Sequence, residues 1–286
     1  MKGHLEMGIV VGIDIGGSTT KIAGFKGDKM LLPVQISASN AIASLFGAFG
    51  KFLYDNKLDL SDIEQVNLTG VGSSSVEQAI YGLPTYKVDE FTANGVGGGY
   101  FAGDKKEFMV VSMGTGTSFV SVKDGIPAHL GGIGIGGGTI IGLSKLMLNT
   151  NDIDKIQDLA SGGEVGHIDL RIGDISPKPL PGLNLEITAS NFGKASSRAT
   201  CEDKAAGIVH MVIESICQTA ALISQGTNIK DFILIGALTN FPECEYVSSM
   251  IKTLFPDLNF LVPKDGEYGT AIGTALAERC CLKRIG

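Results

Sequence analysis

Short apolar runs that end in small polar residues recur along this chain, and each predicts a strand that leads into a tight loop. The first run, residues 9–13, is β-branched apart from one glycine and ends at Asp14. This composition is typical of a strand buried on both faces of a sheet. Comparable runs with polar or Gly-rich ends follow at 66–74, 108–125 and 231–242. The pattern therefore predicts sheets whose strand ends carry several small loops.

Apolar residues at helical spacing predict helices between these strands. They occur at 39–56, from near Phe91, from about Thr139, at 203–225 and within 264–280. The segment at 203–225 is apolar over most of its length, so we expect it to be buried in a lobe or at a subunit interface. Strands that alternate with helices in this way indicate an α/β fold.

The chain of 286 residues is long enough for about two lobes. The polar turn at 103–107 is a suitable end for the first of them. Residues 108–125 then resemble the opening stretch, because both have an apolar strand, a turn of glycines and hydroxyl side chains, and a second apolar strand. We therefore expect a duplicated arrangement, with an N-terminal lobe over 1–107 and a C-terminal lobe over 108–286 that face each other across a cleft.

Charge and composition exclude several classes of partner. The net charge is −7 and no block of Lys or Arg is dense, which argues against a nucleic-acid partner. The first residues lack an apolar signal segment, and no stretch approaches the roughly 18 uninterrupted apolar residues of a membrane helix. We therefore expect a cytoplasmic protein with no membrane partner. The five cysteines form an odd set without C-x-x-C spacing, so we expect reduced and mostly buried thiols.

The residues after the first strand combine an acid, two glycines, three hydroxyls and a lysine. The glycines give the backbone freedom to present its N–H groups to one concave site, which favours an anion. Asp14 could hold a hydrated divalent cation, and the ammonium of Lys21 could neutralise a terminal phosphate. Two glycines between apolar stretches are also the signal of an ordinary β-hairpin, so both interpretations stay open. The candidate nucleotide-binding residues here are Asp14, Gly16, Gly17, Ser18, Thr19, Thr20 and Lys21.

A second Gly-rich region, HLGGIGIGGGTIIGLSKLML at 129–148, ends in an apolar helical pattern from about Thr139. The N–H groups and the dipole at a helix N-terminus bind anions well. The three glycines before the helix therefore predict a phosphate-binding helix start. The alternative is a flexible loop followed by a core helix.

Taken in order, these segments resemble the superfamily of acetate and sugar kinases, heat-shock chaperones and actin. Within it, six stretches resemble the successive motifs of type II pantothenate kinases and span about four fifths of the chain: DIGGSTTK, DEFTANGVG, MGTGTS, GGIGIGGGTIIGL, ITASNFG and DFILIGALTN. The resemblance implies a two-lobed, actin-like ATPase fold with duplicated ribonuclease H-like lobes around a nucleotide cleft. It also implies the use of ATP and Mg²⁺, and a homodimer.

The resemblance implies roles for individual residues. Asp14 would lie near the metal and Lys21 on the terminal phosphates of ATP. Thr115 and Ser118 match hydroxyls that contact ATP and the substrate. The ATP-binding candidates of the second lobe are Thr115 and Gly116 in the second phosphate motif, Gly137, Gly138, Thr139, Ile140 and Ile141 at the helix start, and Gly236 and Ala237 beside the adenosine.

Glu90, in the sequence Glu-Phe-x-Ala, matches the catalytic base of the family. The acceptor hydroxyl must lose a proton as it attacks the γ-phosphorus, and a carboxylate within about 3 Å can take that proton. An acid at this position can also be a helix N-terminal residue stabilised by the dipole. The neighbouring Asp89 competes with Glu90 for either role.

His129 marks a departure from the family pattern. The resemblance implies an arginine directly before the second Gly-rich loop, where it pairs with the carboxylate of pantothenate, whereas this chain reads PAHLGG. An arginine is a permanently charged bidentate donor, but a histidine near neutral pH is smaller and only partly charged. His129 is therefore a substrate-binding candidate that leaves the acceptor in question, and a surface histidine at a turn is the alternative.

Three hypotheses for function follow. The first is an ATP- and Mg²⁺-dependent kinase that converts pantothenate to 4′-phosphopantothenate, the first step towards coenzyme A. The second is a kinase of the same fold for another hydroxylated small molecule, such as a pantothenate analogue without the carboxylate or an amino sugar. The third is a nucleotide-switch ATPase, in which lobe closure is the output and no acceptor is phosphorylated.

Overall fold

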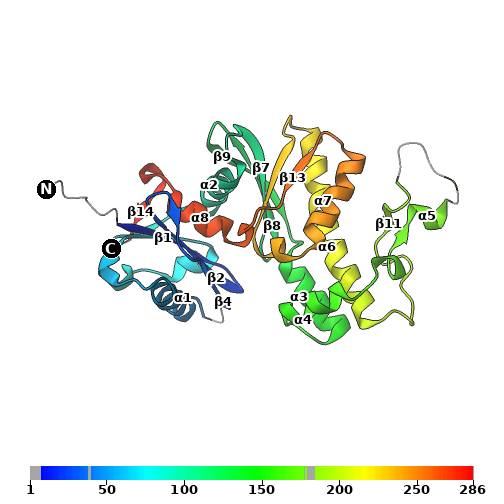
Figure 1. The fold of residues 1–286 in the computed structure, drawn as a ribbon, viewed down its shortest axis with the longest axis horizontal. Coiled ribbons are helices and arrows are strands. Elements are labelled where there is room, and N and C mark those ends of the chain that lie inside the picture. Colours follow the sequence, from blue (N-terminus) through cyan, green and yellow to red (C-terminus); the bar gives the residue numbers. More distant parts are fainter. Residues whose placement is uncertain (1–7, 38–39, 177, 179–183, 286) are drawn as a thin grey trace.

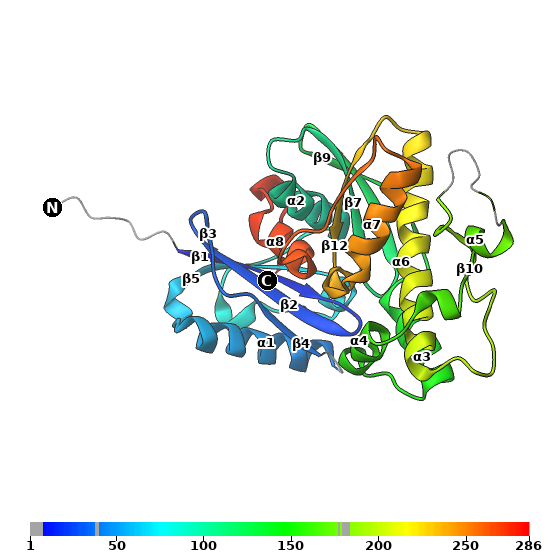
Figure 2. The same ribbon diagram turned by 45° about the vertical axis from the view of Figure 1, so that its right-hand side comes forward.

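The computed structural model describes residues 8–37, 40–176, 178 and 184–285. Two mixed sheets lie side by side with helices against their faces (Figures 1 and 2). The first sheet has the strand order β14-β6-β5-β1-β2-β3, and β4 also pairs with β2. Its strands are β1 (Ile9–Ile15), β2 (Thr19–Lys26), β3 (Lys29–Met30), β4 (Val34–Ser37), β5 (Ile63–Thr69), β6 (Thr85–Lys87) and β14 (Lys283–Arg284).

The second sheet repeats the arrangement of the first. Its order is β13-β12-β7-β8-β9, formed by β7 (Glu107–Met113), β8 (Thr117–Lys123), β9 (Ile126–Ile133), β12 (Asp231–Ile235) and β13 (Asn259–Leu261). In both sheets the opening strand, β1 or β7, is antiparallel to the next strand of the chain and parallel to a later one. That later strand is followed by a further parallel neighbour. The duplication predicted from the two Gly-hydroxyl turns is therefore present in the strand topology.

Eight α-helices are assigned within the described residues. They are α1 (Ala41–Asn56), α2 (Glu90–Ala102), α3 (Gly137–Leu148), α4 (Ile153–Ser161), α5 (Ile172–Ile175), α6 (Cys201–Gln225), α7 (Glu243–Leu254) and α8 (Gly269–Leu276). Short polar side chains begin several of them, as expected at helix N-termini. The side chain of Asn40 accepts the N–H of Ala43 at the start of α1, and Thr200 accepts the N–H of Asp203 at the start of α6.

Alternation of side chains along the strands decides which helix covers which face. In β1, the odd-numbered residues 9–15 pack into a core with α1, and the even-numbered residues face α8. In β7, Met109 and Val111 belong to the core that contains α6, whereas Phe108 and Val110 belong to the one that contains the end of α2. The helices α8 and α2 therefore lie between the two sheets (Figure 1).

The contact between α2 and α8 is made by backbone against backbone. A Cβ atom placed on Gly273 would lie 1.8 Å from the carbonyl oxygen of Ala93, and one on Gly97 would lie 1.9 Å from that of Gly269. On the other side of α8, a Cβ on Gly12 of β1 would lie 2.2 Å from the carbonyl oxygen of Ala271. Only glycine allows approaches this close. The spacing between the two lobes therefore depends on these glycines.

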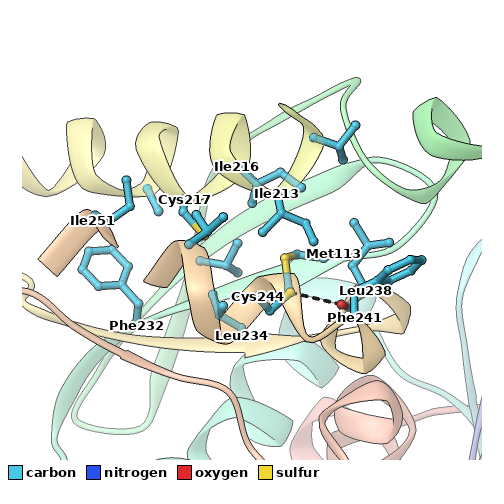
Figure 3. Packing of buried hydrophobic residues seen from close by; sticks show 14 of the residues in the cluster. Met113, Ile213, Ile216, Cys217, Phe232, Leu234, Leu238, Phe241, Cys244 and Ile251 are labelled. Carbon is cyan, nitrogen blue, oxygen red and sulfur yellow. Dashed lines mark hydrogen bonds between the residues drawn. The ribbon is translucent and has the colours of Figure 1, made fainter. Parts of the chain in front are cut away.

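The larger apolar core fills the space between the second sheet, α6 and α7. Figure 3 shows the side chains of α6 and α7 directed towards those of β7 and β12. Cys217 and Cys244 are fully buried there, and the thiol of Cys244 donates to the carbonyl oxygen of Leu238 at 3.1 Å. Burial raises the pKa of Cys217 to about 12. Both residues act as small core side chains, as the sequence predicted for most of the cysteines.

Three of the five cysteines contradict that prediction. Cys201, Cys280 and Cys281 are exposed. Cys201 is the first residue of α6, and the other two lie in a surface turn after α8. The sequence pattern could not separate them from the buried pair, because exposure at these sites depends on which helix face meets the sheet.

A buried polar cluster attaches the small two-stranded sheet of β10 (Leu170–Arg171) and β11 (Thr188–Ser190) to α6. The ring of His210 bonds to Glu243 at 2.5 Å and to Thr188 at 3.3 Å. Asn191 donates to Glu214 at 2.9 Å. Burial lowers the pKa of His210, but the hydrogen bond to Glu243 and the nearby carboxylates, those of Glu214 and Asp169 among them, outweigh it and raise the pKa overall. The raised pKa favours the charged form of the His210 ring beside these carboxylates.

The predicted elements are largely confirmed. The helices expected at 39–56, near Phe91, from about Thr139 and at 203–225 correspond to α1, α2, α3 and α6. The expected final helix is shorter, since α8 covers only Gly269–Leu276. The strands expected near 66, 108 and 231 are present as β5, β7 and β12.

The structure differs from the predicted elements in two respects. The Gly-rich loop predicted from residue 129 is half strand, because β9 continues to Ile133 and leaves a loop of residues 134–136. Glycine has a low intrinsic preference for strands. Backbone pairing with β8 nevertheless holds the glycines of β9 in an extended strand. The helices α4, α5 and α7 were not predicted, although apolar residues at 247, 250, 251 and 254 carry the signal for α7.

The proposed division of the chain at residue 107 falls at the start of β7, between the two sheets. The C-terminal end of the chain, assigned by the sequence to the second lobe, returns to the first sheet. There β14 pairs with β6, and the N–H of Ile285 donates to the carbonyl oxygen of Thr85 at 2.9 Å. The two-segment division therefore stays a prediction, and any definition of the first lobe has to consider this last strand.

The helix α6 is long and apolar enough to cross a membrane by length and composition. Of its most apolar stretch, 67% is buried inside the protein. The same composition is expected of a helix in a core, and α6 contributes many residues to the core in Figure 3.

We expect the α2–α8 contact to be intolerant of a single methyl group. Gly273→Ala should lower the free energy of unfolding by about 2 kcal/mol or more, because the new Cβ meets a fixed backbone oxygen. Gly50→Ala is the matched control, since Gly50 is an exposed position of α1 with no atom within 4 Å of an added Cβ. That change should leave stability equal or raise it by up to about 1 kcal/mol. Denaturant unfolding of both variants tests this, and equal stability of Gly273→Ala and the native protein would contradict it.

Candidate active site

The turns that follow β1 and β7 face each other across the two lobes. A Cβ atom on Gly17, in the first turn, would lie 3.8 Å from the hydroxyl oxygen of Thr115 in the second. Gly17, Ser18 and Thr115 are exposed. The first turn is a hairpin turn closed by a hydrogen bond from the N–H of Gly16 to the carbonyl oxygen of Thr19 at 2.9 Å. The hairpin and the anion-binding loop, which the sequence left as alternatives, are thus compatible in one element.

Asp14 lies at the edge where the parallel strands β1 and β5 end, opposite Thr69. It is half-buried, and the chain after β5 passes directly against its carboxylate. A Cβ on Gly70 would lie 2.6 Å from Oδ1 of Asp14, and Gly70 has φ of +83°. This position therefore requires glycine for both space and conformation. The carboxyl ends of parallel strands are where α/β folds bind ligands.

Lys21 of β2 lies opposite Asp14 of β1 in the antiparallel strand register. Both side chains therefore lie on the face of the sheet that is turned towards α8. Lys21 is only 5% exposed. Burial lowers the pKa of Lys21, while the charges of Asp14 and Glu267 raise it. Burial raises the pKa of Asp14, and Lys21 lowers it. Each group therefore supports the charged form of the other in a setting that disfavours isolated charges.

Asp89 and Glu90 have different positions at the start of α2. Oδ1 of Asp89 accepts the N–H groups of Phe91 and Thr92 at 3.1 and 3.0 Å, so Asp89 is the N-cap residue. Glu90 is the first residue within the helix. Asp89 therefore takes the capping role that the sequence left open between the two acids, and the assignment of Glu90 as the base stays a prediction.

The charge of Asp14, at the strand edge, acts on Glu90. Part of its side chain is open to solvent, yet partial burial raises its pKa, and the negative charges of Asp14 and Asp89 raise it further. Hydrogen bonds fix the approach of α2 to this edge. The hydroxyl of Thr69 donates to the carbonyl oxygen of Val88 at 3.0 Å, and the N–H of Val88 donates to Leu68 at 2.8 Å. A carboxylate with a raised pKa is suited to accept a proton.

His129 lies against the start of α2. It is an exposed residue of β9, and its ring stacks on Phe91 with a centroid distance of 3.7 Å and an interplanar angle of 13°. One turn further along the helix, Pro127 packs against Gly95. The ring of His129 therefore lies on the residue that follows Glu90 in the helix, although 39 positions separate His129 from Glu90 in the sequence.

Ser118 lies on the same face of the second sheet as His129. Alternation along β8 directs it to the face that also carries Val120 and Val122, which pack in the core beside α2. It pairs with Ser112 of β7 and Gly132 of β9. Thr117, one residue earlier, is directed to the opposite face, and its hydroxyl donates to the carbonyl oxygen of Ile135 at 2.8 Å.

The start of α3 does not match the sequence prediction of free N–H donors for phosphate. The N–H of Gly137 donates to the carbonyl oxygen of Gly114 at 2.8 Å, and that of Gly138 donates to Thr115 at 2.9 Å. The N–H groups of Thr139 and Ile140 both donate to Gly136, at 2.9 and 3.2 Å. These hydrogen bonds hold the second turn against the helix start, and the assignment of Gly137 to Ile141 to ATP stays a prediction. Ile141 follows within the same helix and is partly exposed.

Two further candidates are buried away from the turns. Thr20 is fully buried, and its hydroxyl bonds to that of Ser44 on α1 at 2.9 Å. It neighbours Lys21 in an extended strand, so the two side chains point to opposite faces. Ile140 is also fully buried and belongs to the core with α6. Thr19 is partly exposed at the first position of β2.

Gly236 and Ala237 lie where β12 ends beside the second turn. Gly236 has φ of +99°, and a Cβ there would lie 2.5 Å from the carbonyl oxygen of Met113. Its N–H donates to Gly266 at 2.9 Å. Leu238, two residues later, lies 3.7 Å from an added Cβ on Gly137. The second turn, with Gly116, the start of α3 and this strand end are thus in contact.

A magnesium site fits this edge only as part of a complex with phosphates. Within the described ranges, no three or more His, Cys, Asp or Glu side chains are grouped as around a bound metal ion. Asp14 supplies one half-buried carboxylate at the edge where β1 and β5 end. Mg²⁺ is commonly held by one or two carboxylates together with substrate phosphates and water. The residues present therefore fit Mg²⁺ bound with a nucleotide.

Sequence reasoning missed three neighbours of the site. Gly70 presses against Asp14, Glu267 acts on Lys21, and Phe91 stacks on His129. A signal existed for Gly70, because it ends a strand in the same way as the first Gly-rich turn. Glu267 and Phe91 could not be found in this way, because their partners are distant in the sequence.

Solved structures of other proteins share this fold. The activator of the 2-hydroxyisocaproyl-CoA dehydratase from Clostridium difficile, with bound ADPNP, matches with a TM-score of 0.67 at 16% identity and covers 94% of this chain and 93% of its own. A ROK family glucokinase from Streptomyces griseus, in complex with glucose and AMPPNP, matches with a TM-score of 0.56 at 12% identity over 96% of this chain and all of its own. The chain therefore has the two-lobed actin-like ATPase fold.

Sequence comparison is more specific. The family model described as Fumble matches residues 85–253. A type II pantothenate kinase from Bacillus cereus (strain G9842) is 31% identical over 277 residues, which cover 93% of this chain and 97% of that kinase. One from Bacillus anthracis is also 31% identical, over 93% and 96% of the two chains. The chain is thus a kinase of the actin-like fold, and it belongs to the type II pantothenate kinase family.

Proposed function

We propose that this protein transfers the γ-phosphoryl group of ATP to the primary hydroxyl of pantothenate and so forms 4′-phosphopantothenate, the first step of coenzyme A biosynthesis. The observation that carries the proposal is the position of Glu90: it begins α2, its neighbour Asp89 caps the helix, and its pKa is raised beside Asp14. A base of this kind is what an alcohol acceptor requires. Family membership supports ATP and pantothenate as the reactants.

The two facing turns support the binding of a triphosphate between the lobes. We assign the exposed backbone and hydroxyl groups of Gly17, Ser18 and Thr115 to the phosphates, and Asp14 to Mg²⁺. When bound, Mg²⁺ neutralises charge on the phosphate oxygens. Lys21 is held near Asp14 and Glu267, and its role is to offset negative charge that develops on the transferred group.

Glu90 then accepts the proton of the acceptor hydroxyl as that oxygen attacks the γ-phosphorus. The stacked pair of Phe91 and His129 borders this end of the cleft, with Ser118 on the neighbouring strand. In this proposal His129 receives the carboxylate end of pantothenate. The proposal also includes a homodimer in the cytoplasm, which is supported by the family alone.

A second candidate function is favoured by the same stacked pair. The imidazole of His129 lies flat on Phe91 and offers at most two N–H donors, without the planar fork of an arginine. A kinase with this end group could use a neutral analogue of pantothenate as its acceptor. The choice between the two candidates is a question of the acceptor and leaves the reaction type unchanged.

We expect pantothenate to stimulate the release of ADP from Mg-ATP by the purified protein. The measurement compares reactions without acceptor, with pantothenate, and with the neutral amide of pantothenate. Stimulation by pantothenate supports the first candidate, and stimulation by the amide alone supports the second. Slow ADP release that no acceptor changes would contradict both and favour a nucleotide switch.

Glu90→Gln should lower kcat by about 10²-fold or more and leave the affinity for ATP nearly unchanged, because loss of a general base affects the chemical step. In the native enzyme, protonation of Glu90 should lower kcat in acid, at a pH above the ordinary value of 4.5 since its pKa is raised. Glu245→Gln, an exposed first-turn acid of α7, is the matched control. Steady-state kinetics and ATP binding test this, and normal turnover of Glu90→Gln would refute the assignment.

His129→Arg should lower the KM for pantothenate, because a guanidinium can stack on Phe91 and also form two hydrogen bonds with a carboxylate. The KM for the neutral amide should change little, which makes the amide an internal control. Equal KM values for pantothenate in the native and variant enzymes would mean that the acid end binds elsewhere.

A further inference from the structure

Two adjacent cysteines form a pair of exposed thiols near the end of the chain. Cys280 and Cys281 close the 3₁₀ turn Arg279–Cys281 between α8 and β14. Their sulfur atoms are 3.8 Å apart, and the thiol of Cys280 lies 3.7 Å from a carboxylate oxygen of Glu278. Both side chains are exposed, unlike those of Cys217 and Cys244. The pair is therefore accessible to a small reagent and already in contact.

We propose that Cys280 and Cys281 are a vicinal dithiol that is oxidised reversibly to an intramolecular disulfide by small-molecule disulfides. One thiolate attacks a sulfur of the small disulfide and forms a mixed disulfide, releasing one small thiol. The second cysteine then displaces the other small thiol and forms the Cys280–Cys281 bond. The protein loses two electrons and two protons, and the small disulfide is reduced to two thiols.

The product would be strained and easily reduced. Neighbouring Cα atoms are about 3.8 Å apart across a trans peptide, whereas disulfides usually span about 4.4 to 6.8 Å between Cα atoms. Closure of the small ring must therefore distort the peptide between the two cysteines. Strained and exposed disulfides have higher reduction potentials than buried structural disulfides, and they are therefore the ones that are easily reduced or regulatory.

The turn that would be distorted adjoins the start of α2. Two backbone hydrogen bonds hold it, from Cys281 to Glu278 at 2.9 Å and from Leu282 to Arg279 at 3.2 Å. Leu282, the next residue, packs against Val88 and Ala93, which flank Glu90 in the sequence. The strand β14 then pairs with β6, which leads directly to Val88.

A change in the 280–281 peptide therefore acts on the packing of Leu282 against Val88 and Ala93, on either side of Glu90 in the sequence. Oxidation therefore lowers kcat by displacing the start of α2. This expected effect on kcat rests on the proposed function. A displacement of less than 1 Å is expected to lower kcat by about tenfold, since a full 1 Å misplacement can cost about 10²-fold.

The first test measures the chemistry without any activity assay. The native protein is incubated with oxidised glutathione, and rapidly reacting thiols are titrated before and after. The count should fall from three, the exposed cysteines, to one, Cys201. Trypsin cleaves after Arg279 and Lys283, so the peptide Cys280–Lys283 should be lighter by two hydrogen atoms and carry no glutathione. A persistent glutathione adduct on the peptide Cys280–Lys283, a dimer linked through that peptide or three remaining thiols would overturn the proposal.

The second test measures the effect on the protein. Hydrogen exchange at residues 85–88 and 282–285 should become faster on oxidation, and kcat should fall and recover with a reductant. Cys280→Ser should keep its kcat under oxidation, whereas the Cys201→Ser control should behave like the native protein. A disulfide that forms without change in exchange or kcat would overturn the coupling to Glu90. If no acceptor is phosphorylated at all, the thiol count, peptide mass and exchange still decide the inference separately from the proposed function.

Discussion

The close contact between α2 and α8 is the constraint on which the rest of the structure depends. Each of these helices covers the inner face of one sheet, and they meet through the glycine positions 97, 269 and 273. Buried hydrogen bonds add direction to the contact: Thr270 donates to Asn94 at 2.8 Å, and Asn67 of the first sheet donates to the carbonyl oxygen of Thr274 at 2.9 Å. Because α2 begins with Glu90, the same contact that spaces the lobes also sets the position of the candidate base.

The electrostatics of the strand edge follow from this packing. Asp14, Lys21 and Glu90 come from three elements, β1, β2 and α2. The fold buries them partly or fully, raises the pKa of both acids and lowers that of the lysine. Such opposed shifts in one place are typical of sites where charge is moved during a reaction. The same residues in a fully solvated cleft would gain little from one another.

The second Gly-rich turn illustrates a different use of helix termini. The start of α3 has the glycines expected of a phosphate site, yet its first N–H groups donate to carbonyl oxygens of the turn at 114–115. A helix start must satisfy its free donors, and here the protein itself does so. The result is a turn held rigidly opposite the first one, with Thr115 exposed towards Gly17. Rigid positioning of a loop is as useful to a binding site as a direct contact with the ligand.

The sequence by itself determined the strand and helix periodicities, the two related Gly-hydroxyl turns and the choice of Asp14 as a candidate, since all of these depend on local pattern. Glu90 and His129 became candidates through the resemblance of their motifs to the family. The tertiary structure decided which side chains and backbone groups meet partners elsewhere in the chain, which local pattern does not contain. It turned Thr20 towards α1 and occupied the donors of Gly137 and Gly138. It also stacked His129 on Phe91 and exposed Cys280 and Cys281. The physical reason is that these outcomes depend on which strand face or helix end meets a partner many residues away.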